Sequence, residues 1–138
     1  MFVGILLTVS IVGCKTEGCT DPDAVNWNPD ADTFDGSCQF EGRAVLWYGE
    51  EVSNTKQEWA TSYSFYVDGA IVGSQAVTMF WTGAPDCGQA SSITITKDLG
   101  NNNSMQSTYE VRDDQGYVVW SGSINFQANT CIAIELTL

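Results

Sequence analysis

The stretch SYSFYVDGAIVG, residues 62–73, contains the clearest fold signal in the sequence. In residues 62–67, Tyr63, Phe65 and Val67 occupy every second position. A period of two predicts a β-strand with one buried face. The Asp68-Gly69 dipeptide that follows favours a type I′ turn, because both central residues of that turn have positive φ. The stretch therefore predicts a β-hairpin.

The same alternation continues through the rest of the chain from residue 42 onward. It predicts further strands at residues 43–48, 77–81, 91–96 and 131–138, and a second hairpin at residues 107–122. In the last strand the expected buried residues are Ile132, Ile134, Leu136 and Leu138, and in residues 91–96 they are Ile93 and Ile95. Residues 53–60 offer one or two helical turns at most. We therefore predict an all-β fold, with an antiparallel, immunoglobulin-like β-sandwich over residues 42–138.

The N-terminal run MFVGILLTVSIVGC is apolar from Phe2 to Gly13 and ends at Cys14. It is too short to span a bilayer, which takes about twenty residues, but its length is typical of the apolar part of a signal peptide. A buried N-terminal strand or helix is the alternative interpretation.

The sequence Ile11-Val12-Gly13-Cys14 resembles the lipobox of bacterial lipoproteins, although no Lys or Arg precedes the apolar run. The resemblance implies that residues 1–13 are removed as a lipoprotein signal peptide and that Cys14 carries a diacylglycerol and an amide-linked fatty acid such as palmitate. Several acyl chains on one residue anchor a protein stably to a membrane. The expected location is the bacterial cell envelope, as an outer-membrane lipoprotein that is periplasmic or surface-exposed.

With Cys14 assigned to lipid, an even number of cysteines remains, and in an exported protein this predicts two disulfides with three possible pairings. Pairing between neighbours in the sequence is the most economical, which joins Cys19 to Cys38 and Cys87 to Cys131. Cys131 falls on the outward face of the last strand. We therefore expect its disulfide to attach that strand to the loop around Cys87 rather than to lie between the sheets.

The segment GCTDPDAVNWNPDADTFDGSC, residues 18–38, is acidic and rich in turn residues. Asp21-Pro22, Asn28-Pro29 and Asp35-Gly36 predict turns, because Pro fixes φ and Asx side chains accept bonds from nearby backbone N–H groups. The large apolar residue Trp27 is expected to fill a small core beside the disulfide. The segment resembles the GCTDPxAxNYNPxAxxDDGSCxY modules of secreted and surface proteins of marine bacteria, with Trp27 and Phe34 as departures. The resemblance implies that residues 14–41 are a lipidated tether with an extracellular spacer module, without enzymatic activity.

The aspartates of this segment raise the question of a metal site. Asp30, Asp32 and Asp35 could form a weak Ca²⁺ site, although their spacing does not match an EF-hand loop. Turn-forming and capping roles are the alternative. The sequence indicates no other cofactor.

Charge excludes several functions. The chain has 17 acidic and 5 basic residues, no histidine and a net charge of −12. Nucleic-acid binding needs clustered Lys and Arg, and Ser-His or Cys-His catalysis needs histidine, so neither is expected. Carboxylate chemistry remains conceivable, with an acidic pair drawn from Glu50, Glu51, Asp86, Asp113 and Asp114.

Aromatic residues exceed what a small core requires, and exposed rings are typical of sugar- and protein-binding surfaces. Trp81 and Trp59 are the predicted ligand contacts, whereas the alternative is that most aromatic residues are core or sheet-surface pairs. We therefore predict a non-catalytic, lipid-anchored surface protein that binds a protein or a glycan. A Ca²⁺-dependent adhesive and an envelope hydrolase with paired carboxylates are the alternatives.

Overall fold

The structure is a computed structural model that describes residues 13–138. The predicted signal peptide, apart from Gly13, lies outside the described residues. The elements are β1 (Glu17–Gly18), β2 (Thr33–Phe34), β3 (Phe40–Trp47), α1 (Glu50–Lys56), β4 (Ser62–Val67), β5 (Ala70–Ala76), β6 (Ile93–Gly100), β7 (Ser104–Asp113), β8 (Val118–Gln127) and β9 (Cys131–Glu135). The prediction of an all-β fold is confirmed, since α1 is the one helix in this part of the chain.

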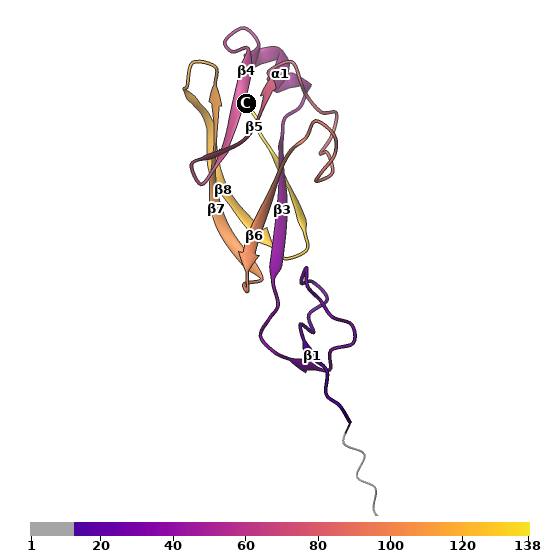
Figure 1. Cartoon of the computed structure of the whole chain (residues 1–138). Helices are drawn as coiled ribbons and strands as arrows, with labels where there is room; N and C mark the ends of the chain where they lie inside the picture. Colours follow the sequence, from indigo (N-terminus) through magenta and orange to yellow (C-terminus); the bar gives the residue numbers. More distant parts are fainter. Residues whose placement is uncertain (1–12) are drawn as a thin grey trace, which may run out of the picture.

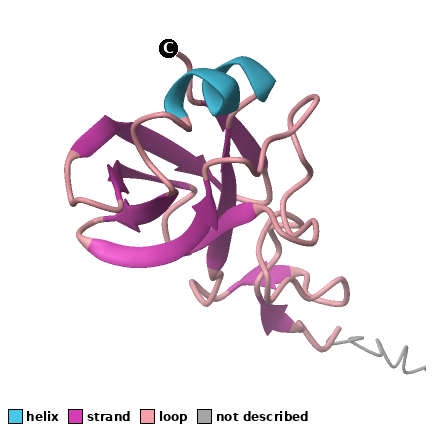
Figure 2. Ribbon diagram, turned by 90° about the horizontal axis from the view of Figure 1, so that it is seen from above, coloured by secondary structure: helices cyan, strands magenta, loops and turns pink. Residues whose placement is uncertain are grey.

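Strands β3 to β9 form two open sheets with the orders β6-β3-β9 and β5-β4-β7-β8. Both sheets contribute to a single buried cluster, with Ala44 and Leu46 from β3, Phe65 from β4, Val111 from β7 and Phe126 from β8. Figures 1 and 2 show the two groups of strands in views turned by 90°. The short parallel pair β1–β2 lies in the N-terminal module at one end of this body, and α1 lies at the opposite end (Figure 1).

The immunoglobulin-like part of the prediction is not confirmed. If β3 to β9 are lettered A to G, the sheets are DAG and CBEF, whereas immunoglobulin constant domains have ABED and CFG. In addition, β3 and β9 pair in parallel, although the sequence predicted antiparallel strands. The two strands are the first and last of the body and no hairpin joins them, so both can run in the same direction.

The hairpin at residues 62–73 forms as the sequence predicts. Tyr63, Phe65 and Val67 are buried on β4, and residues between them are half-buried. Asp68 and Gly69 have φ values of 49° and 81°, as the turn requires. The prediction that Ile93 and Ile95 are buried is also confirmed.

Several local predictions were wrong. Residues 77–81 are not a strand: Val77 is buried, but the chain then leaves the sheet as the long loop between β5 and β6, where Met79 and Phe80 are exposed. Leu138 is 59 % exposed, because β9 ends at Glu135 and Leu136 is the last residue that reaches the core. The helical turns begin at Glu50, three residues before the predicted start.

The loop between β5 and β6, residues 77–92, is held against the outer side of the three-stranded sheet. The Cys87–Cys131 disulfide fastens it to the start of β9, and the Gly88 N–H donates to Thr94 Oγ1 over 2.9 Å. Pro85 is buried within it. Cys131 itself is exposed, so this disulfide lies on the outward face, as its position in the last strand predicted.

Among residues 13–138, no helix has both the length and the apolar character that crossing a membrane requires.

Candidate functional site

Cys14 lies at the N-terminal end of the described chain. It is exposed and forms no disulfide, whereas the other four cysteines are paired. It precedes Gly18, the second residue of β1, by four residues. At about 3.4 Å per extended residue, a group attached to Cys14 therefore stays close to the N-terminal module.

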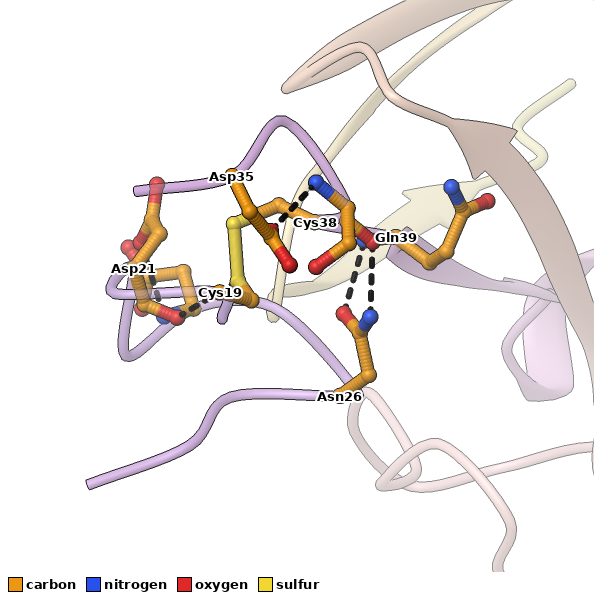
Figure 3. Close-up of a disulfide and its surroundings, with 8 residues drawn as sticks. Cys19, Asp21, Asn26, Asp35, Cys38 and Gln39 are labelled. Carbon is orange, nitrogen blue, oxygen red and sulfur yellow. Dashed lines mark hydrogen bonds between the residues drawn. A yellow bond between two sulfur atoms is a disulfide. The ribbon is translucent and has the colours of Figure 1, made fainter. Parts of the chain in front are cut away.

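The N-terminal module is held by a buried disulfide between Cys19 and Cys38, whose Cα atoms are 4.8 Å apart (Figure 3). This is the neighbouring pairing that the sequence predicted. Cys19 and Cys38 are 1 % and 4 % exposed, and together with Ala24 they belong to the same buried cluster as Phe40 of β3. The small core of the module is thus continuous with the core of the body.

Asx side chains form the turns of the module. Asp21, Asn28 and Asp35 each accept, through Oδ1, the backbone N–H two residues further on, over 2.9–3.0 Å. Hydrogen bonds from the Ser37 side chain and backbone N–H hold the pKa of the Asp35 carboxyl below its ordinary value. These residues therefore act as turn formers, which is one of the two roles considered for the aspartates.

Asn26 fixes the end of the module to the segment that leads into β3. Its Nδ2 donates to the Ser37 carbonyl over 2.7 Å, and its Oδ1 accepts the Gln39 N–H over 2.8 Å (Figure 3). Sequence reasoning assigned no role to Asn26. Its two partners lie eleven and thirteen residues away, so no local pattern identifies the interaction.

The prediction that Trp27 fills the core of the module was wrong. Its side chain is 48 % exposed, and the residue is held through a backbone bridge to Cys19. Within residues 18–38 the buried apolar residues are instead the two cysteines of the disulfide and Ala24.

The structure does not support a Ca²⁺ site at Asp30, Asp32 and Asp35. Within residues 13–138, no three Asp, Glu, Cys or His side chains are grouped so that they could hold a metal ion. Asp32 Oδ1 instead accepts the Thr16 N–H and the Thr33 hydroxyl, both over 3.0 Å, and Asp35 caps its own turn.

At the end of the body opposite the module, hydrogen bonds hold several segments together. The carboxylate of Asp114, in the β7–β8 turn, accepts the N–H and the hydroxyl of Thr61, just before β4. The backbone N–H of Trp81 donates to the backbone carbonyl of Tyr48 over 3.0 Å, just after the end of β3. The segment after α1, the β7–β8 turn and the start of the β5–β6 loop therefore meet at this end, which we call the distal end.

Exposed aromatic side chains occur on these distal segments. Trp59 follows α1 and is 73 % exposed, Tyr117 follows the β7–β8 turn and is 69 % exposed, and Phe80 is 38 % exposed. Trp81 is half-buried. Of the two predicted ligand contacts, Trp59 is thus open to solvent and Trp81 is partly covered; Tyr117 and Phe80 were not singled out in the sequence.

Other aromatic residues at this end are structural. The ring of Tyr48 stacks on that of Trp120 and meets that of Tyr63 edge-on, with centroids 6.2 and 5.8 Å apart. The Trp120 Nε1–H donates to the Thr137 carbonyl over 2.7 Å. Burial raises the pKa of the Tyr63 phenol to about 12, so this phenol stays neutral at physiological pH. These three rings belong to the core or pack against it. They fit the alternative prediction that many of the aromatic residues are core or sheet-surface pairs rather than ligand contacts.

The candidate catalytic carboxylates serve other purposes or lie apart. Asp113 Oδ1 accepts the N–H groups of Gln115 and Tyr117, and Asp114 binds Thr61. Glu50 and Glu51 lie at the start of α1, at the distal end. Asp86 precedes Cys87, whose disulfide attaches it to Cys131 at the start of β9, far from the distal end that β9 reaches at Glu135. Hydrogen bonds from Thr61 lower the pKa of Asp114, while a general acid needs a raised pKa.

No family model matches the chain, and no curated protein or solved structure matches it. The two ends of the molecule carry its distinctive features: an exposed cysteine beside the disulfide-bonded acidic module, and exposed aromatic side chains at the distal end.

Proposed function

We propose that the protein is a lipid-anchored cell-envelope protein, held in the outer membrane by acylated Cys14, whose body presents a non-catalytic surface for a protein or a glycan. The observation that carries the proposal is the separation of the two ends. Cys14 is exposed at one end, and Trp59 is 73 % exposed at the other. In Figure 1 the chain enters the module at the bottom and α1 lies at the top.

The contacts between module and body support the role of a spacer. Within the module, the bonds of Asn26 and the bond from the Val25 N–H to the Gln39 carbonyl, over 2.9 Å, brace the segment that leads into β3, and Asn129 Nδ2 of the body donates to Asp23 Oδ1 of the module over 3.2 Å. The shared buried cluster adds apolar contact across the junction. A module held at several points keeps the distal end away from the membrane instead of letting it swing freely.

The proposal includes a two-layer β-sandwich as the architecture of the body. Supporting this, residues of both sheets pack into one cluster. The strand order argues that such a sandwich is a different arrangement from that of immunoglobulin constant domains.

The absence of histidine from the sequence and the local roles of Asp113 and Asp114 favour binding over catalysis. Large aromatic side chains that stay exposed in a folded protein are typical of interaction sites. Binding at the distal end also leaves the N-terminal lipid free to anchor the protein.

The anchor is tested by expressing the full chain in a bacterial host and measuring the mass of the purified protein. We expect the mature chain to begin at an acylated Cys14, to be four hydrogens lighter than the reduced form because of its two disulfides, and to enter the detergent phase of a Triton X-114 partition. The Cys14→Ser variant should remain in the aqueous phase. A wild-type protein that keeps Met1 and stays aqueous would contradict the proposal.

The binding surface is tested separately by glycan arrays and by capture of envelope proteins. Binding should be lost in Trp59→Ala and weakened in Trp81→Ala, because the first side chain is open to solvent and the second is half-buried. Binding that survives both substitutions would place the surface elsewhere.

A further inference from the structure

We propose that the partner of the distal end is a cationic polypeptide segment, rich in Lys or Arg. The inference rests on the proposed binding function and names the chemistry of its partner. We call the site the distal surface; it consists of the aromatic residues Trp59, Phe80 and Tyr117 and the carboxylates of Glu50, Glu51, Glu58, Asp113, Asp114 and Glu135.

The aromatic part of the distal surface comes from segments that the fold holds together. The bonds of Asp114 to Thr61 tie the turn that precedes Tyr117 to the segment that follows Trp59. The bond from the Trp81 N–H to Tyr48 places Phe80, its neighbour, at the same end of β3. Such rings provide large contact areas with few rotatable bonds, which is why they dominate binding energies at protein interfaces.

The charge of the distal surface is strongly one-sided. Its six carboxylates accompany a single base, Lys56 in the last turn of α1. Glu135 reaches this end because β9 runs alongside β3 up to Trp47. Five of the six carboxylates belong to exposed residues, and Asp113 is half-buried.

Elsewhere on the body two of the carboxylates are neutralised by ion pairs, whereas Asp86 and Asp98 form none in the described part of the chain. Lys97 pairs with Asp68 over 2.8 Å, and Arg112 pairs with Glu110 over 2.7 Å. Within residues 13–138, no carboxylate of the distal surface takes part in an ion pair. The distal surface therefore carries a net negative charge that a cationic partner would compensate.

Aromatic faces and carboxylates together fit Lys and Arg side chains better than they fit a neutral sugar. A neutral glycan could stack on the rings and donate hydroxyl groups to the carboxylates, but it would leave their negative charge uncompensated, and a nucleic acid would be repelled. Cationic side chains bind both, because they pair with carboxylates and are attracted to aromatic faces. The body already contains one such contact, in which the Arg112 guanidinium lies 5.3 Å from the centre of the Tyr66 ring.

The test uses the full lipidated chain in nonionic detergent micelles and, as the probe, a synthetic peptide in which lysine and alanine alternate. Binding is measured by calorimetry at physiological ionic strength, where the Debye length is about 8 Å and remote charges contribute little. We expect Trp59→Ala, and separately the Glu50→Gln, Glu51→Gln double variant, to weaken binding about tenfold. A moderate increase in salt should weaken binding of the wild type further.

The module at the other end provides matched controls. Trp27→Ala removes another exposed tryptophan, and the Glu17→Gln, Glu41→Gln double variant removes two exposed charges. These variants should bind the peptide as the wild type does. Equal weakening by distal and module variants would show attraction to net charge alone and would overturn the inference, as would absence of peptide binding or tighter binding of cellohexaose.

The outcome is separable from that of the anchor. The mass spectrum of the same sample reports acylation of Cys14 directly, so a failed anchor leaves the peptide result interpretable. Circular dichroism of each variant confirms that the β-structure is intact, and a second substitution, Tyr117→Ala, tests the surface if Trp59→Ala does not fold.

Discussion

Asp68 joins three strands through one carboxylate. It lies in the β4–β5 turn, where its Oδ2 accepts Lys97 Nζ from β6 over 2.8 Å and its Oδ1 accepts the Thr108 N–H of β7 over 3.0 Å. The hydrogen bond from Lys97, followed by that from Thr108, lowers the pKa of Asp68 to about 2. The turn residue thus also ties the two sheets together at this corner.

Replacement of Asp68 by Asn should lower the free energy of unfolding at pH 7 by less than about 1 kcal/mol, because the carboxylate is 43 % exposed and solvent screens the pair. Asn tolerates the positive φ of this position, so the turn is retained. The folded-state pKa lies below the unfolded value of 3.8, so the contribution is present above that value and disappears as the pH falls toward about 2. Urea unfolding of both proteins across this range measures the difference; a difference that does not shrink at low pH would contradict the assignment.

Among the elements, β3 of one sheet and β8 of the other come very close together near the start of β3. A Cβ atom added at Gly42 would lie 2.8 Å from the Gln127 carbonyl oxygen and 3.1 Å from Phe126 Cβ, both on β8. The carbonyl belongs to the backbone, so it cannot move aside as a flexible side chain would. Glycine at this position therefore permits the contact between the sheets.

We expect Gly42→Ala to lower the free energy of unfolding by about 2 kcal/mol, as overpacking in a close-packed interior does. Gly83→Ala is the control, because no atom lies within 4 Å of an added Cβ there and the loop backbone is not in the left-handed region. Chemical unfolding of the two variants compares them directly. Similar midpoints for both would show that β3 and β8 can separate at little cost.

The two disulfides join elements of different accessibility, and this predicts their order of reduction. Cys131 is exposed and Cys87 is half-buried, whereas Cys19 and Cys38 are almost completely buried. A thiol reagent must reach a sulfur atom before exchange begins. Limited treatment of the native protein with dithiothreitol, followed by alkylation and mass spectrometry, should therefore label Cys87 and Cys131 first. Earlier labelling of Cys19 and Cys38 would mean that the module opens more readily than its burial implies.

At the scale of the whole molecule, the net charge of −12 acts against compactness, because like charges repel in the folded state. Salt screens this repulsion, so sodium chloride should raise the melting temperature. Calcium chloride at the same ionic strength should raise it no further, since no carboxylate group within residues 13–138 is arranged to hold a metal ion. A distinct additional shift with calcium, measured by differential scanning calorimetry, would restore the Ca²⁺-dependent adhesive as a candidate.

Local chemistry explains which features could be predicted. Alternation in β4 and the Asp68-Gly69 turn depend on neighbouring residues, and both form as expected. Residues 77–81 resemble a strand in composition, but the loop is instead held by the Trp81–Tyr48 backbone bond and by the disulfide at Cys87. At the candidate site, Trp59 was identified from its residue type, whereas Tyr117 and Phe80 stand out only when their exposure is known.

Residue type and short-range spacing alone predict the all-β character, the hairpin at residues 62–73, the buried faces of β4 and β6, the acidity and the lack of histidine, because none of these features depends on distant parts of the chain. Only the three-dimensional arrangement sets the order of strands, the parallel pairing of β3 with β9, the bracing of the module by Asn26 and the gathering of exposed rings at the distal end. These features join residues that are far apart in the chain. They arise from the way two sheets bury one shared core, which no local pattern records.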